Sequence, residues 1–185
     1  NRRTASPLPL ERGLVPDGTA AARSTTWACS SASYCALAEH RYNAFMTGTR
    51  LRERLFPRWM WRLPVGEHHV ALTFDDGPDL QSTPRLLSIL DKLNIRVTMF
   101  LIGNESADHP ALLRECAAAG HRIAVHGYTH ESFWWHSSHW QRESILRTAK
   151  VFAESGVNYE PLFRPPHGRF NAVTSRVLSD LGFVG

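Results

Sequence analysis

The chain has 185 residues, of which 43% are hydrophobic and 21% are charged, so disorder along its whole length is excluded. No apolar run approaches the ~18 residues of a membrane-spanning helix, so we expect no transmembrane segment. The net charge is +4, but ten arginines against four acidic side chains lie in residues 1–64, so residues 65–185 offer no basic footprint for nucleic acid.

Three regions follow from the composition. Residues 1–45 are rich in Ala, Ser, Thr, Arg and Pro without apolar periodicity, which predicts a disordered or non-domain extension. Residues 46–68 are basic and aromatic, and residues 69–185 are the predicted folded domain. The middle segment is either a membrane-surface or partner-binding element, or an approach segment packed on the base of a barrel. We favour packing, through the apolar side chains Leu55, Phe56, Trp59 and Trp61.

Strands and helices alternate from residue 69 onward. Apolar runs at 70–74, 96–103, 122–126 and 161–168 predict four strands, the last continuing into a turn. Helical spacing of apolar residues predicts helices at 86–93, 111–120, 141–155 and 171–181. This rhythm predicts a parallel α/β architecture. Polar residues follow three of the strands, which favours a (β/α) barrel over an open doubly wound sheet.

A metal site is suggested by Asp76, His126 and His130. The two histidines are four residues apart, one helical turn, so both can face one ion, and a carboxylate from another strand adds a third ligand. Two histidines and one carboxylate leave positions open for water and substrate. The alternative is an incidental spacing among ten histidines, with the Asp-Asp-Gly-Pro run a simple turn.

Together these motifs resemble those of a known family. TFDDGP (73–78), HGYTH (126–130) and RPPHG (164–168) are similar to the first three motifs of the polysaccharide deacetylases, carbohydrate esterase family 4. The resemblance covers about residues 55–185 and implies the distorted (β/α) barrel of that family. It also implies a metal-dependent hydrolase that removes N-acetyl groups from an amino-sugar polymer or oligosaccharide, chitin-like or peptidoglycan.

The resemblance implies a role for each matching residue. Asp75 matches the catalytic base, and Arg164 the arginine that holds it, with bidentate pairing expected. Asp76, His126 and His130 match the metal ligands, with zinc as the first choice of divalent ion. The backbone N–H of His167 matches the group that helps to bind the oxyanion.

Substrate contacts are expected from another small set of residues. Pro165 and Pro166 are candidates from the third motif. In the segment 130–140, a tryptophan such as Trp134 can stack on a sugar ring, with His136 and His139 as donors at the rim. The alternative, which we favour for this segment, is that its tryptophans pack the loop against the following helix.

The sequence departs from the family pattern at three places. Gly127 stands where Ser or Thr is frequent, and its missing hydroxyl is expected to loosen the loop of the metal histidines. His167 stands where Tyr is frequent. We expect this change to be tolerated, because the group that this position contributes is its backbone N–H. The chain also reaches Gly185 soon after the third motif, so the family's two later motifs, its general acid and its C-terminal strands are absent from this stretch. We therefore expect residues 1–185 by themselves to be a poor deacetylase with an incompletely closed barrel.

Two other functions also fit the sequence: a small-molecule amide hydrolase on the same fold, and a non-catalytic carbohydrate-binding remnant. An extracytoplasmic or cell-envelope location is favoured by the resemblance alone. Three sparse cysteines, Cys29, Cys35 and Cys116, form no disulfide framework, and Cys116 is expected to be a buried helix thiol.

Overall fold

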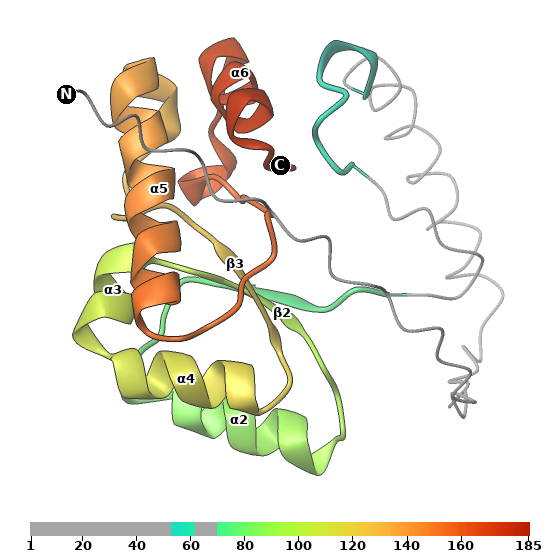
Figure 1. Ribbon diagram of the computed structural model, residues 1–185. Helices are drawn as coiled ribbons and strands as arrows, with labels where there is room; N and C mark the ends of the chain where they lie inside the picture. The colour runs from blue at the N-terminus through green and yellow to red at the C-terminus, as the bar shows by residue number, and fades with distance from the viewer. Residues whose placement is uncertain (1–52, 62–69) are drawn as a thin grey trace, which may run out of the picture. The chain divides into compact units, whose positions relative to one another are not determined.

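The computed structural model describes residues 53–61 and 70–185. Three parallel strands form one sheet in the order β1-β2-β3, with β1 at Thr73–Asp75, β2 at Thr98–Leu101 and β3 at Arg122–Val125 (Figure 1). The first three of the four predicted strands are thus confirmed, and each is shorter than the apolar run that predicted it. Because all strands run in the same direction, their carboxyl ends meet at one edge, where β1 is followed by the first candidate motif.

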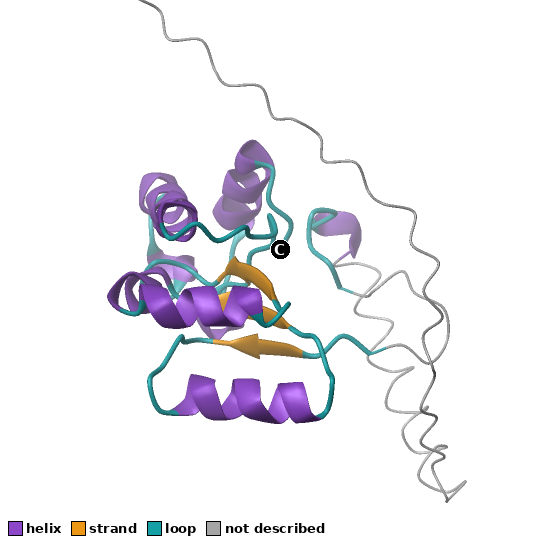
Figure 2. Ribbon diagram, turned by 60° about the horizontal axis from the view of Figure 1, so that its bottom comes forward, coloured by secondary structure: helices purple, strands orange, loops and turns teal. Residues whose placement is uncertain are grey.

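Five helices alternate with or follow these strands in the described part of the chain (Figure 1). They are α2 (Ser82–Lys92), α3 (Gly103–Asp108), α4 (Pro110–Ala118), α5 (Ser138–Glu154) and α6 (Ala172–Leu181). Figure 2 shows the strands side by side with helices alongside them. Two short 3-10 turns, η1 (Phe133–Trp135) and η2 (Pro166–Gly168), precede α5 and α6. The helices predicted from apolar spacing are all present, which confirms the α/β class.

The helix α3 has no counterpart in the sequence prediction. It is six residues long, too short for an apolar repeat, and it forms because tertiary contacts hold it. Its first residue, Gly103, sits where an added Cβ would lie 2.6 Å from Thr148 Oγ1 and 2.7 Å from Tyr128 Cδ2. Only glycine lets α3 approach α5 and the 128 loop this closely.

The predicted fourth strand at 161–168 is not a strand. The sheet continues there only as isolated parallel bridges, Val125 with Phe163 and Leu162 with Val184. The backbone N–H of Arg164 still donates to the carbonyl of Val125 at 3.0 Å, but the two prolines that follow have no N–H with which to extend a ladder.

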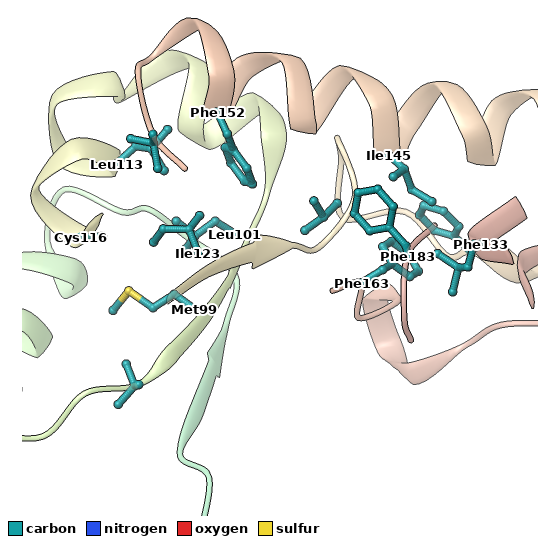
Figure 3. Close-up of a cluster of buried hydrophobic side chains, with 14 of the residues drawn as sticks. Met99, Leu101, Leu113, Cys116, Ile123, Phe133, Ile145, Phe152, Phe163 and Phe183 are labelled. Atoms are coloured by element: carbon teal, nitrogen blue, oxygen red, sulfur yellow. The ribbon is translucent and has the colours of Figure 1, made fainter. Parts of the chain in front are cut away.

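The core contains two neighbouring groups of side chains (Figure 3). One joins the sheet to α4 through Met99, Leu113, Cys116 and Ile123, among others. The other is aromatic and contains Phe133, Phe163 and Phe183. Phe133 is completely buried, and its burial stabilises the fold by roughly 1.5–3 kcal/mol. It also anchors the loop that precedes α5 to the end of the sheet.

Cys116 is a free, fully buried thiol within α4, as expected, and burial raises its pKa to about 11. Cys29 and Cys35 lie outside the described residues. Within the described part of the chain, no helix has both the length and the apolar character needed to cross a membrane.

The aromatic approach segment packs, but not as predicted. The Trp59 ring stacks on Phe170 with centroids 3.7 Å apart, and its Nε1–H donates to Ser175 Oγ at 2.8 Å. Phe56 and Trp61 also approach Phe170, at 5.4 and 6.2 Å. The partners therefore follow the third motif rather than lying at the base of a barrel. Leu55 is 61% exposed, so its predicted packing is wrong.

Candidate metal centre and catalytic residues

Two neighbouring carboxylates at the end of β1 point to different partners. Asp75 is the last residue of the strand, and Asp76 has the left-handed backbone angle φ = 68°. Gly77 follows with φ = 75°, so the chain turns sharply at this point. As a result Asp75 meets Arg164, whereas Asp76 meets two histidines. This divergence allows one carboxylate to bind an ion while the other remains available for proton transfer.

Asp76, His126 and His130 converge as the sequence predicted. Asp76 Oδ1 lies 3.4 Å from His126 Nε2 and 3.3 Å from His130 Nε2. One ligand atom from each of the three residues lies within 4.8 Å of the others. This spacing and this combination of nitrogen and oxygen donors fit a divalent cation such as zinc.

His126 is fixed in position and tautomer by the backbone. Its side chain is buried, and its Nδ1 lies 2.7 Å from the carbonyl oxygen of Arg164. Since a carbonyl can only accept, Nδ1 carries the proton and Nε2 keeps its lone pair toward Asp76. Burial is the largest cause of a lowered pKa at His126, opposed by the negative charges of Asp75 and Asp76. A neutral imidazole is the form that binds a metal.

The two histidines do not share a helical turn. Residues 126–130 form a loop, and Gly127 adopts φ = +89° within it. The expected reason for their convergence was therefore wrong, although the convergence itself is real. Two neighbouring elements hold the loop: Gly103 N–H donates to the carbonyl of Gly127 at 2.9 Å, and Tyr128 N–H donates to Ser144 Oγ at 2.8 Å. These bonds supply bracing that does not require a hydroxyl at position 127.

Arg164 holds Asp75 through one nitrogen, not two as expected. Its Nη1 donates to Asp75 Oδ1 at 2.6 Å and to Thr73 Oγ1 at 2.8 Å. The guanidinium carbon also lies 4.1 Å from the centroid of the Phe100 ring. Sequence reasoning missed Thr73, although it lies two positions before Asp75 and so shares its face of the strand.

His167 joins the same cluster through its ring. It has a left-handed φ of 59° within η2, a conformation uncommon outside glycine and a frequent mark of functional turns. Its imidazole lies edge to face with that of His130, with centroids 4.3 Å apart.

The expected substrate-contact residues divide into two groups. Pro165 and Pro166 are buried and shape the turn, and Pro165 also lines a hollow together with Phe100 and Arg164. Their contact with substrate stays a prediction. Trp134 and Trp135 are 48% and 78% exposed, so for these two the preferred packing interpretation is wrong. It is correct for Trp140, which stacks on His136 at 3.7 Å and meets Phe133 edge-on at 5.3 Å.

The exposed tryptophans lie on an anchored loop. Asn171 Nδ2–H donates to the carbonyl of Trp134 at 2.9 Å, which ties the loop to the start of α6. His136 is one of the two expected rim donors, and its Nε2 lies 3.3 Å from Oε2 of Glu131. His139, the other, is exposed.

The parallel α/β sheet, with polar side chains gathered beyond the carboxyl ends of its strands, is the arrangement in which α/β barrels carry their sites. The sequence profile of the polysaccharide deacetylases matches residues 62–185. The chain belongs to the polysaccharide deacetylase family. The family resemblance inferred from the three motifs is thus confirmed.

Individual relatives agree with this assignment. The chain is 33% identical over 135 residues to a peptidoglycan-N-acetylglucosamine deacetylase of Bacillus cereus, covering 72% of this chain and 63% of that protein. It is 35% identical over 114 residues to a chitooligosaccharide deacetylase of Rhizobium leguminosarum, covering 61% and 51%. A solved family 4 carbohydrate esterase from Streptomyces lividans, in complex with acetate, is 37% identical with a TM-score of 0.60, covering 64% and 62%. The chain therefore spans less than two thirds of the length of each.

Proposed function

We propose that the chain carries the metal and base half of a metal-dependent hydrolase that removes N-acetyl groups from an amino-sugar polymer. The observation that carries this proposal is the convergence of Asp76, His126 and His130 within 4.8 Å, next to an ion pair between Asp75 and Arg164. Relatives named as deacetylases of peptidoglycan and of chitooligosaccharides support an acetylated amino-sugar substrate.

Zinc is the proposed ion. Two imidazoles and one carboxylate leave coordination positions open, the pattern of catalytic zinc sites. The hydrogen bond from His126 Nδ1 to the carbonyl of Arg164 supports this assignment, because it directs Nε2 toward Asp76. A divalent ion held here would act as a Lewis acid and lower the pKa of water.

Asp75 is the proposed general base. Its partner Arg164 lies at 2.6 Å, and this contact orients the carboxylate. The ionised carboxylate takes a proton from the attacking water. The backbone N–H of His167 donates to the oxygen that becomes negative as the acetamide carbonyl is attacked. Arg164 acts on Asp75 and is therefore a positioning residue.

Trp134 is the proposed contact for the sugar. It is half exposed on the loop that follows His130, and its backbone is held by Asn171. Aromatic faces bind the apolar faces of sugar rings by stacking, so an exposed and anchored indole on this loop suits a polymeric carbohydrate.

The test is acetate release from N-acetylated chitooligosaccharide and from peptidoglycan, measured with the protein at its natural length. Release should require zinc, stop on chelation and resume when zinc is restored. Asp75→Asn should retain zinc binding and lose turnover. Release that persists in the chelated protein would contradict the metal assignment, and absence of release from every N-acetylated sugar would contradict the proposed reaction.

A further inference from the structure

A hollow lies beside the loop of the metal ligands, between residues 128–131 and the exposed side of α5. Its volume is about 230 Å³, and Thr129 and Glu131, which flank His130 in the chain, both line it. The volume is below the roughly 300–1,000 Å³ typical of sites for drug-sized ligands, so the hollow suits one small ring.

One wall of the hollow carries an unpaired carboxylate. Glu143 lies four residues before Arg147 on α5, a spacing and order at which an ion pair is expected. Arg147 instead places its guanidinium carbon 3.7 Å from the centroid of the Tyr128 ring. In the part of the chain that the structure describes, no cation pairs with Glu143. Its charge is thus available to a ligand.

The opposite wall carries a second carboxylate held in place. Glu131 Oε1 accepts a hydrogen bond from Thr129 Oγ1 at 2.9 Å, and Oε2 lies 3.3 Å from His136 Nε2. His136 is in turn stacked on the ring of Trp140, which also lines the hollow. The hollow therefore has an aromatic surface and an excess of negative charge, because two carboxylates, Glu131 and Glu143, and only one cation, Arg147, line it.

We propose that this hollow binds a sugar ring that carries a free 2-amino group, a deacetylated unit of the same polymer. The proposal rests on the proposed function, because it makes a product-like unit part of what the protein recognises. The ammonium group is complementary to Glu143 and Glu131, and the apolar side of the sugar ring to the part of Trp140 that lines the hollow and is not covered by His136. An acetylated unit has no charge at this position, so the hollow distinguishes the two kinds of unit.

The experiment measures binding by the full chain after its metal has been removed by chelation, so that no turnover occurs. Three linear tetramers are compared by calorimetry at a pH at which the amines are protonated: β-1,4-linked glucosamine, N-acetylglucosamine and glucose. The glucosamine tetramer should bind most tightly. Glu143→Gln should weaken that binding about tenfold, as expected for loss of a charge-assisted contact, and leave the glucose tetramer unaffected.

The control variant is Glu154→Gln on the same helix, whose carboxylate lies 3.6 Å from Lys150 and does not line the hollow. It should bind all three tetramers as the wild type does. Equal affinity of the wild type for the three tetramers would overturn the proposal, as would unchanged binding in Glu143→Gln. Since the measurement needs neither metal nor acetate release, failure of the proposed reaction and failure of this subsite are seen separately.

Discussion

The imidazole of His167 lies edge to face against that of His130, with centroids 4.3 Å apart. The other candidate histidine ligand, His126, is oriented by a hydrogen bond to the carbonyl of Arg164. The orientation of His130 instead follows from ring contacts on two sides, with His167 and, at 5.5 Å, with His126. The His167 side chain is therefore placed to orient a metal ligand, in addition to the role of its backbone.

Replacing His167 by alanine should lower zinc affinity by about tenfold, the lower end of the effect of removing groups that orient ligands. His167→Phe keeps an aromatic ring and should restore most of that affinity. Calorimetric titration with zinc measures both variants. If phenylalanine is as damaging as alanine, a nitrogen of His167 contacts the ion and the ring-contact explanation is wrong.

Zinc binding itself should depend on the predicted ligands. His126→Ala is expected to remove most of the affinity, and the double variant with His130→Ala all that can be measured, because Asp76 alone cannot hold the ion. The exposed His139, which is outside the cluster, provides the matched alanine control. Undiminished binding by the double variant would exclude this site.

Asp75→Asn should reduce turnover ~10²–10⁴-fold while zinc affinity stays near the wild-type value, because an amide has nearly the same shape but cannot take the proton. Acetate release and zinc titration on the same preparation test both parts. Normal turnover in this variant would mean that another group accepts the proton.

Thr73→Val tests the second acceptor of Arg164. It preserves the shape of the side chain but removes the oxygen that lies 2.8 Å from Nη1. We expect kcat to fall on the order of tenfold with little change in KM, because Arg164 then holds Asp75 less firmly. Thr73→Ser keeps the hydroxyl but lacks the methyl, and it should turn over at close to the wild-type rate. An equal loss of kcat in Thr73→Ser would show that packing of the side chain, and not its hydroxyl, is responsible.

His121 should make the fold sensitive to acid. Its side chain is buried, neither ring nitrogen has a hydrogen-bond partner in the described part of the chain, and burial, with the charge of Arg96, lowers its pKa below 6.5. The unfolded chain therefore binds the proton first, and stability falls as the pH drops below about 6.5 toward the folded pKa. Urea unfolding at pH 7.5 and pH 5 should show a larger loss for the wild type than for His121→Leu. Equal losses would show that His121 is not responsible.

Much of the fold was readable because its signals are local. The apolar runs around β1, β2 and β3 and the helical spacing of α2, α4, α5 and α6 depend on residues close in the chain. The polar residues that follow these strands were recognisable for the same reason. The helix α3 was not, because six residues carry no repeat and their conformation depends on packing against α5.

The sequence by itself determined the α/β class, the family and the residue types available for chemistry, since these are written in short motifs and local periodicity. Tertiary structure alone decided which of these side chains come into contact and in what geometry. Arg164 lies 89 residues from Asp75 and 91 from Thr73, and no local pattern could predict that one of its nitrogens serves both. The unpaired state of Glu143 was likewise invisible, because it follows from Arg147 turning toward the distant Tyr128 ring. Side-chain direction depends on neighbours that only the folded chain brings within contact distance.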